Sequence, residues 1–479
     1  MENNKTPMVK KLASWTFSFK NIGCISQGEI DAKPLTIMCG KNNTGKTWVM
    51  YSLYGFLNMP SPLLKLPQIA NFAKELVENG NFEFNVIDWI EANFPIIKKE
   101  FNKSASRMLE SVFNTSDKDI FSNSTFDWVI DESDLKANVL EKRLEISLVL
   151  GTGKKEVMLI SKESNSDMIN MTLLDSNFPR LESFINMTLS QLLKIEYDES
   201  PAFLIPAERN GLHLFFNELS SRRTALLHHA SKEQFDLNSL LNDVMKSKYS
   251  APIANYIDWL NEIKVNRKSK NGEFHKLAEE LKKIISGKYS VDTEGQIYFS
   301  TYKKGSKAAS KIELHLSSST VKSLFGLWFY LEHQAKTGDI LMIDEPELNL
   351  HPSNQRVIAR FLAKLVNSGL RIVVSTHSDY FVKEINSLMM LHSVPENLKS
   401  ERNTVMKKQG ISEESILNPE CVAAYVFDNN SVSEMRKTNE GINAITFDEV
   451  INSINDDNDE IYYSLIDGLS VEEGDDNHE

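Results

Sequence analysis

The feature that most restricts how this chain can fold is a loop with two glycines that follows a short apolar run. Residues 35–38 (LTIM) form the run, and residues 40–47 (GKNNTGKT) match the phosphate-loop pattern G-x-x-x-x-G-K-[ST]. The apolar run predicts a buried strand, and the pattern after the loop predicts a helix that runs through Leu53. This order is typical of α/β nucleotide-binding folds, and an ordinary glycine-rich turn is the alternative interpretation.

Each residue type in the loop has a chemical reason. Glycines permit backbone conformations that direct successive N–H groups at phosphate oxygens, and the helix N-terminus adds partial positive charge. Lys46 would meet the β- and γ-phosphates of ATP, and the Thr47 hydroxyl would bind Mg²⁺. The predicted nucleotide-binding residues are Gly40, Asn42, Asn43, Thr44, Gly45, Lys46 and Thr47.

The composition limits the class of protein. The chain has 479 residues, 41% of them hydrophobic, and a formal net charge of −13. That length predicts about three domain-sized units with enough apolar residues for a core. Residues 1–36 show no secretory signal and the apolar runs are strand-sized, so we expect a cytoplasmic protein with no membrane partner. The negative charge argues against nonspecific coating of DNA.

Cysteines and charge runs add three smaller predictions. Cys24, Cys39 and Cys421 lack metal-ligand spacing and are expected to be buried free thiols. Acidic residues gather at 456–460 and at 472–479, where we expect a solvated tail. A basic run at 264–276 is either a solvated hairpin tip or a contact with nucleic acid phosphate or an acidic partner.

A second apolar strand ends in two carboxylates. Residues 340–343 (ILMI) precede Asp344 and Glu345, and four apolar residues in a row are typical of a strand buried on both faces of a parallel sheet. Asp344 would hold Mg²⁺ through water, and Glu345 would orient and deprotonate an attacking water. The alternative is that the pair merely caps a helix or turn.

The next apolar strand, residues 370–375, ends before His377. A lone histidine is usually structural, but one at the tip of a strand beside the acidic pair can contact a γ-phosphate, and we predict a sensor role for His377.

Residues 314–316 predict a further strand, followed by a serine-rich turn at 317–320 and a helix over 321–334. This arrangement predicts a second anion site, which two chains packed head to tail could bring onto one ATP.

The order of these motifs resembles ABC-type ATPases of the SMC, RecF and OLD kind. "IDEPELNLHPSNQ", "VVSTHSDYFVKEIN" and "FLIPAERNGL" (203–212) are similar to the OLD-like AAA-15/AAA-21 group, which includes ATPases of anti-phage defence systems such as AriA of PARIS and PtuA of Septu. The matching segments cover about half of the chain. The resemblance implies an α/β fold, with an ABC-type P-loop sheet flanked by helices, an inserted α+β lobe and an inserted helical hairpin.

Residue by residue, the resemblance implies that Lys46 and Thr47 are the phosphate-loop pair, Asp344 a Mg²⁺ ligand, and Glu345 and His377 catalytic. Ser317, followed by Ser318, matches the signature serine that would cross to a partner's γ-phosphate, and residues 349–351 match a loop along the dimer seam. Two departures stand out. Ser318 and Ser319 stand where related ATPases usually carry a glycine, which favours slow hydrolysis. The glutamine expected near Mg²⁺ is missing, and Glu208 or Arg209 is the candidate substitute.

We predict the following division of the chain. The ATPase sheet is formed by residues 1–57 and 201–211. The inserted lobe is formed by residues 58–200 and the helical hairpin by residues 212–290. Residues 291–479 complete the ATPase and end in a strand, a helix and an acidic tail. Within the lobe we expect helices over 58–126 and a hairpin of strands 144–150 and 157–160. No nuclease motif follows His377, so we expect no nuclease domain in this chain.

Three functions remain open from the sequence. The favoured one is an ATPase scaffold or sensor of an anti-phage system that assembles with itself through ATP and controls a separate effector, a nuclease or toxin, in response to a phage-derived trigger or DNA. The second is a RecF- or SMC-like ATPase that clamps DNA directly in repair or recombination. The third is a module that binds ATP without hydrolysing it appreciably and holds a toxin.

Overall fold

The computed structural model describes residues 15–58, 64–117, 119–150, 155–175, 178, 180–193, 201–216, 249–266, 272–301, 311–438, 441–442 and 445–466. The described chain is built around a nine-stranded mixed sheet with the order β5-β1-β2-β16-β15-β3-β14-β13-β9. Its strands are β1 (Thr16–Ile22), β2 (Ile25–Asp31), β3 (Leu35–Gly40), β5 (Thr125–Val129), β9 (Phe203–Ile205), β13 (Ile340–Asp344), β14 (Arg371–Thr376), β15 (Val422–Asp428) and β16 (Ser431–Glu434). The predicted α/β class is confirmed.

The middle of this sheet is parallel. β3 pairs with both β14 and β15, β14 pairs with β13, and β13 pairs with β9, all in parallel. β1, β2 and β5 form an antiparallel flank at one side. Because parallel strands end at the same edge of a sheet, the loops that follow β3, β13, β14 and β9 are brought together although they are far apart in the sequence.

Successive residues of the central strands face opposite sides of the sheet, as the period of two requires. On β3, Met38 belongs to one apolar core and Ile37 to the other; on β13, Met342 and Ile343 divide in the same way. The first core is covered by α1 (Lys46–Leu57) and α3 (Val86–Phe113). The second is covered by α12 (Ser319–His333), α13 (Pro352–Asn367) and α14 (Asp379–His392). Burial on both faces explains why these strands read as unbroken apolar runs.

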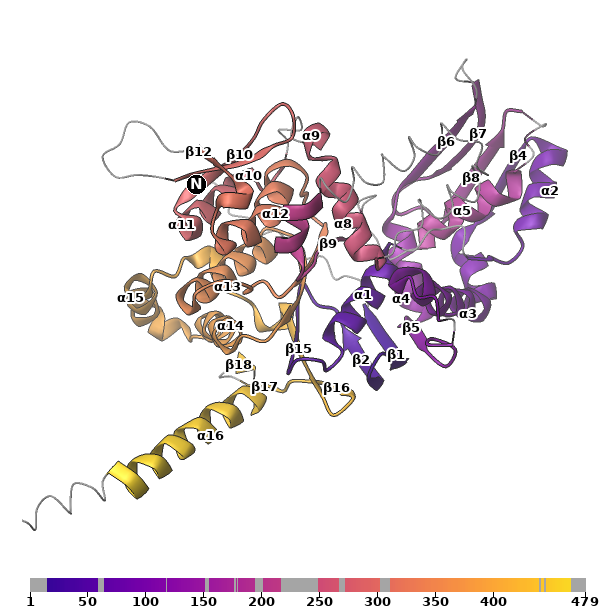
Figure 1. Ribbon diagram of the computed structural model, residues 1–479. Helices are drawn as coiled ribbons and strands as arrows, with labels where there is room; N and C mark the ends of the chain where they lie inside the picture. Colours follow the sequence, from indigo (N-terminus) through magenta and orange to yellow (C-terminus); the bar gives the residue numbers. More distant parts are fainter. Residues whose placement is uncertain are drawn as a thin grey trace, which may run out of the picture.

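The region between α1 and β9 contains a second sheet. Its order is β4-β8-β7-β6, with β4 (Asn81–Asn85), β6 (Leu144–Leu150), β7 (Lys155–Lys162) and β8 (Met168–Leu173), and it extends to one side of the molecule beside α2 (Ile69–Asn79) and α5 (Leu181–Leu193) (Figure 1). The hairpin predicted over 144–160 corresponds to β6 and β7. The prediction of helices throughout 58–126 is wrong at β4 and β5, which are short strands between α2, α3 and α4 (Glu132–Glu141).

The second inserted region is described in part. It contains α8 (Ala251–Asn261), α9 (Ile263–Asn266), α10 (His275–Ala278), the 3₁₀ turn η2 (Glu279–Leu281) and α11 (Lys282–Ile285), followed by a small sheet of β10 (Gly287–Val291), β11 (Ile297–Thr301) and β12 (Lys311–Glu313). Residues 217–248 and 267–271 lie outside the described residues, so the helical hairpin and the middle of the basic run at 264–276 stay predictions. The strand predicted over 314–316 is wrong, because Leu314–Leu316 forms a 3₁₀ turn, η3.

The chain after β14 completes the sheet and then leaves it. It contains α15 (Lys399–Gln409), the short 3₁₀ turns η4 (Glu396–Leu398), η5 (Glu413–Ser415) and η6 (Pro419–Cys421), and the paired strands β17 (Lys437–Thr438) and β18 (Gly441–Ile442). The last helix, α16 (Ile445–Ile461), continues into a π-helical turn, η7 (Tyr462–Ile466), and projects from the body of the molecule (Figure 1). Residues 456–460 are exposed, as expected for a solvated acidic stretch.

Two chain-wide expectations can be compared with the described residues. All three cysteines are free, as predicted, but only Cys39 is buried, since Cys24 and Cys421 are half-buried. Within the described ranges, every helix is too short or too polar to cross a membrane. The division of the chain into domains stays a prediction.

Candidate functional site

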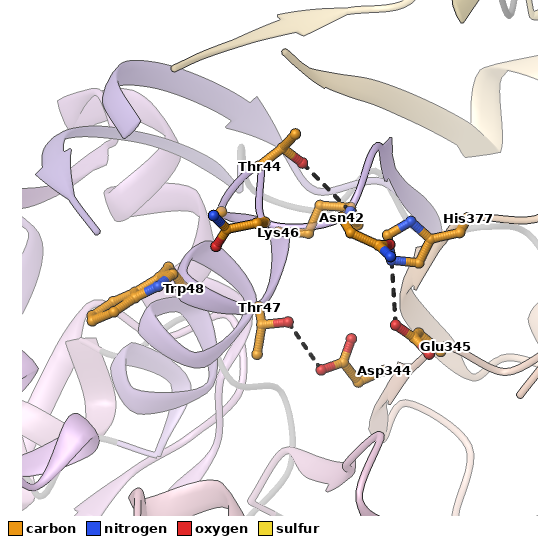
Figure 2. Close-up of a pocket in the computed structure, with 10 residues that line it drawn as sticks. Asn42, Thr44, Lys46, Thr47, Trp48, Asp344, Glu345 and His377 are labelled. Atoms are coloured by element: carbon orange, nitrogen blue, oxygen red, sulfur yellow. Dashed lines mark hydrogen bonds and ion pairs between the residues drawn. The ribbon is translucent and has the colours of Figure 1, made fainter. Parts of the chain in front are cut away.

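The candidate site lies at the edge where the parallel strands end. The phosphate loop follows β3, Asp344 ends β13 with Glu345 next to it, and His377 comes directly after β14. These residues line one pocket of about 240 Å³, together with the phosphate loop and the first turn of α1 (Figure 2). The lining residues are Asn42, Asn43, Thr44, Gly45, Lys46, Thr47, Trp48, Asp344, Glu345 and His377.

The phosphate loop has the conformation that its glycines allow. Gly40 and Gly45 have φ values of 147° and 96°, in the region that favours glycine. Gly45 is the N-cap of α1, so the N-terminus of that helix faces the pocket. The Lys46 ammonium donates hydrogen bonds to the carbonyls of Gly40, at 2.9 Å, and Lys41, at 2.7 Å. Burial lowers the pKa of Lys46, while the nearby Asp344 carboxylate opposes that shift.

Asp344 is buried and is held by two hydroxyls. The Thr47 hydroxyl donates to Oδ2 at 3.2 Å, and the Ser375 hydroxyl donates to Oδ1. Burial raises the pKa of Asp344, and the neighbouring Glu345 raises it further, whereas the Ser375 hydrogen bond opposes the shift. A buried carboxylate whose charge is opposed by its surroundings favours a nearby cation.

The residues on the side of the pocket formed by Thr47 and Asp344 fit Mg²⁺ rather than a softer metal. Thr47 and Asp344 supply a hydroxyl and a carboxylate oxygen, the ligand types that Mg²⁺ prefers, and nucleotide phosphates and water would supply the rest. Among the described residues, no cluster of three or more histidine, cysteine or acidic side chains could hold a metal without other ligands. Such a site therefore suits a cation that arrives with a nucleotide.

Glu345 is held in an unusual backbone conformation. Its φ is 52°, in the left-handed region that non-glycine residues rarely adopt. Its N–H donates to the carbonyl and to the hydroxyl oxygen of Ser375, at 3.2 and 3.1 Å. Its Oε1 lies 3.2 Å from Nε2 of His377. This hydrogen bond lowers the pKa of Glu345, so its carboxylate is ionised at neutral pH and can accept a proton.

The serine-rich turn is placed differently from the expectation. The sequence predicted that Ser317 would contact a partner's γ-phosphate. Ser317 is 9% exposed and its hydroxyl donates to the Leu314 carbonyl at 2.6 Å, so this hydroxyl is bonded within its own chain. The turn folds this way because η3 directly precedes it and its last carbonyls need donors. Ser318 is exposed and is the N-cap of α12, where its hydroxyl accepts from the Val321 N–H. Neither serine lines the pocket of Figure 2.

The segment predicted to follow a dimer seam lies beside that turn. Asn349 and His351 are exposed, and the Asn349 carbonyl accepts a 2.8 Å hydrogen bond from the Thr320 hydroxyl in the first turn of α12. The exposed start of α12 and the 349–351 loop therefore form one continuous surface. Contact of this surface with a partner's phosphate stays a prediction.

Sequence reasoning missed two residues that support the site. Glu347 is buried, and its Oε1 accepts from the Thr376 hydroxyl at 2.7 Å and from the His377 N–H at 2.8 Å, which fixes the start of the histidine loop. Ser375 bridges Asp344 and Glu345 from the neighbouring strand. Glu347 lies three residues after Asp344, and this short spacing between acidic residues was the sequence signal that could have identified it. No sequence feature distinguishes Ser375 from the other serines of the chain.

Arg209, named beforehand only as a substitute for a missing glutamine, has a clear position. It follows β9, it is 1% exposed, and its guanidinium donates to the carbonyls of Asp344 and Glu345 at 2.8 and 2.6 Å. Glu208, beside it, is exposed and close enough to raise the pKa of Asp344 by charge repulsion. Arg209 therefore holds the backbone of the acidic pair and is not itself a lining residue of the pocket.

Comparison with known protein families gives a match over most of the chain. The family described as AAA ATPase domain (AAA_15) matches residues 16–382, a range that includes the phosphate loop, the acidic pair and His377. Comparison with curated proteins finds no match.

Solved structures that match this chain include SMC head domains. An Smc head domain with an extended coiled coil, bound to the C-terminal domain of ScpA, from Pyrococcus furiosus has 12% identity and a TM-score of 0.32, with 92% of this chain and 99% of that chain covered. The SMC head domain from Thermotoga maritima has 11% identity and a TM-score of 0.30, with 88% and 98% covered. At TM-scores this low the likeness is weak, and the strand order and site geometry define the fold.

Proposed function

The chain belongs to the AAA ATPase domain family, and we propose that it binds ATP with Mg²⁺ in the pocket at the end of β3, β13 and β14 and hydrolyses it to ADP and phosphate. The single observation that supports this most is the convergence of Lys46, Asp344, Glu345 and His377, from three strands, on one pocket. A P-loop, a metal-binding carboxylate, a base and a γ-phosphate contact are the parts that phosphoryl transfer to water needs.

The binding step uses the phosphate loop. Backbone N–H groups of Asn42, Asn43, Thr44 and Gly45 and the start of α1 would surround the β-phosphate, while Lys46 would exchange its two carbonyl partners for phosphate oxygens. Thr47 and Asp344 would hold Mg²⁺, which would supply positive charge to the phosphates. The negative charge of a triphosphate is thus met by groups that the sheet edge already presents.

The hydrolytic step uses Glu345. A water oxygen attacks the γ-phosphorus, the bond from that phosphorus to the β,γ-bridging oxygen breaks, and ADP leaves with the bond's electron pair. Glu345 accepts the proton that the water loses. His377 would keep Glu345 ionised and oriented, and because it lines the same pocket it would also contact the γ-phosphate. These roles are the ones predicted for Glu345 and His377.

The test separates binding from chemistry. We expect Lys46→Ala to weaken ATP binding at least about 10-fold, because a charge-assisted contact to phosphate is lost. We expect Glu345→Gln to keep ATP affinity and to lower the single-turnover rate about 100-fold or more, because the base is removed. Isothermal titration and phosphate release measure the two effects.

Exposed residues of α15 provide matched controls, Lys407→Ala and Glu401→Gln. Wild-type turnover in Glu345→Gln would contradict the assignment.

We also propose that ATP joins two copies of the chain. The exposed Ser318 and Ser319 at the start of α12 and the 349–351 loop form the surface for this contact. The contact would use N–H groups at these two serines and not the Ser317 hydroxyl. Sedimentation of Glu345→Gln with and without ATP tests this dimer. ATP should raise the mass of the particle to at least that of a dimer, and an unchanged mass would contradict the proposal.

Control of a separate nuclease or toxin in a cytoplasmic anti-phage system remains the proposed role.

A further inference from the structure

Arg209 connects three parts of the molecule that the ATPase site needs. Its guanidinium donates five hydrogen bonds: Nε to the carbonyl and the hydroxyl of Ser323, Nη1 to the carbonyls of Pro206 and Asp344, and Nη2 to the carbonyl of Glu345. Ser323 lies in α12, one turn after the exposed Ser318 and Ser319. Arg209 thus joins the end of β9, the acidic pair and the helix that begins at the serine-rich turn.

The hydroxyl of Ser323 completes the connection. It accepts from Arg209 Nε at 3.0 Å and donates to the Leu348 carbonyl, also at 3.0 Å. Leu348 belongs to the turn after the acidic pair, where its N–H is bonded to the Glu345 carbonyl. One side chain of α12 therefore touches both the arginine and the turn that carries Glu345. Ser323 is itself buried.

The backbone of Glu345 needs such support. A left-handed conformation at a residue with a side chain is strained and persists only where surrounding contacts fix it. Ser375 holds the Glu345 N–H from one side, and Arg209 holds the Glu345 carbonyl from the other. Without the arginine, the Glu345 carbonyl would keep only the Leu348 N–H as a partner, so the backbone that carries the carboxylate would be held less firmly.

We propose that Arg209 is a positioning residue that fixes Glu345 for attack on ATP and, through Ser323, makes that position depend on α12. The inference rests on the proposed ATPase function and adds a route within one chain. A shift of α12, whose N-cap Ser318 and first residue Ser319 are exposed, displaces Ser323 and with it Arg209 and the Glu345–Leu348 turn. A partner contact at the start of α12 would in this way control hydrolysis.

An arginine suits this place for a chemical reason. Its planar group offers five donors in a fixed arrangement, and the carbonyls of Asp344 and Glu345 need two of them at once. Asp344, Glu347 and Glu345 lie near enough to favour its charge, while burial lowers its pKa. The carbonyls are not ligands for a nucleotide, so the arginine acts through Glu345 and not on ATP.

The decisive variant is Ser323→Ala, which removes the shared hydroxyl and leaves Arg209 in place. We expect its single-turnover ATP hydrolysis to fall about 5- to 10-fold, the effect of about one lost hydrogen bond on the barrier. Its affinity for ATP should be unchanged, because Ser323 does not line the pocket. Hydrogen exchange at the Leu348 and Leu350 amides should become faster, because the turn loses its anchor on α12.

The matched control is Ser190→Ala. Ser190 is also a buried serine within a helix, α5, and its hydroxyl has no hydrogen-bond partner among the described residues. We expect this variant to keep wild-type hydrolysis and wild-type exchange at the two amides. Arg209→Lys, which retains charge but not the paired donors, should lose hydrolysis about 100-fold if it folds.

The outcomes divide clearly. Wild-type hydrolysis together with wild-type exchange in Ser323→Ala would overturn the inference, and so would weaker ATP binding with an unchanged rate. If the wild-type protein itself does not hydrolyse ATP, the proposed function fails, and exchange at Leu348 and Leu350 still decides whether α12 controls the turn. Should Arg209→Lys not fold, Ser323→Ala carries the test alone.

Discussion

The hydroxyl of Thr47 and the carboxylate of Asp344, which are 297 residues apart in the chain, lie 3.2 Å apart at the edge of the central sheet. The first ends the phosphate loop and the second ends β13, and only β14 separates their strands. This pair joins the two halves of the proposed nucleotide site.

Removing the Thr47 hydroxyl should weaken magnesium-dependent binding. In Thr47→Val, which keeps the shape of the side chain, we expect affinity for ATP with Mg²⁺ to fall about 10-fold, because an oxygen ligand is lost. Affinity for ATP in the presence of a chelator should not change. Titration calorimetry under both conditions measures this. Thr404→Val, at an exposed position of α15, is the control, and an equal loss under both conditions would contradict the metal role.

Removing His377 should change the pH dependence of hydrolysis. His377 lowers the pKa of Glu345, so the base stays ionised as the pH falls. In His377→Gln the pKa of Glu345 should rise, and the acid limb of the rate profile should move to higher pH. Single-turnover rates measured from pH 5 to pH 8 test this. A rate that is lower by the same factor at every pH would show that His377 acts only on the phosphate.

Glu347 should make the folded protein less stable as the pH rises, whereas a carboxylate whose pKa is lowered by folding has the opposite effect. Burial raises its pKa above the ordinary value of 4.5, so the folded state retains the proton at a pH where the unfolded state has lost it. Stability from this group is present below pH 4.5 and is lost as the pH rises through the folded-state pKa. Glu347→Gln keeps an oxygen for Thr376 and His377 but cannot ionise.

The melting temperature of Glu347→Gln relative to wild type should therefore increase from pH 4.5 upward and level off once the pH exceeds the folded-state pKa of Glu347. Thermal unfolding at four or five pH values measures the difference between the two proteins. Glu401→Gln, at an exposed site, should show no such trend. A difference that is constant with pH would mean that Glu347 titrates normally in the folded protein.

Gly23 should be needed for contact between the β1–β2 turn and the phosphate-loop helix. Its φ is 59°, and a β-carbon there would lie 2.6 Å from the Trp48 ring. Gly23→Ala should lower stability by about 1 kcal/mol for the backbone and by more for the clash. Gly80→Ala is the matched control, since Gly80 has φ 74° and open space around it. Equal melting temperatures of the two variants would show that Trp48 moves aside.

The sequence predicted the parts of this molecule that its chemistry marks most strongly. β3, β13 and β14 are buried on both faces, so each is an unbroken apolar run, and each is followed by residues that we propose bind phosphate, metal or protons. Their convergence follows from the parallel pairing of the strands. Helix α1 could be predicted because the phosphate loop fixes its start at Gly45.

Other parts of the structure could not be predicted because their sequences carry weaker patterns. β4 (NFEFN) is short and half-exposed, so its two phenylalanines fit the surrounding helical pattern equally well. Ser317 could not be distinguished from its neighbours, because its orientation depends on the 3₁₀ turn before it. The role of Arg209 depends on carbonyl groups of Asp344 and Glu345, and backbone groups have no sequence signature.

The hydrogen bonds of Lys46 have a consequence for the energy of nucleotide binding. The ammonium group already has two carbonyl partners, from Gly40 and Lys41, within its own loop. An arriving triphosphate must compete with those carbonyls, so the measured affinity is a difference between two sets of contacts. In the proposed catalytic cycle, the same internal contacts would hold the phosphate loop in shape between turnovers, so ATP could bind again without refolding of the loop.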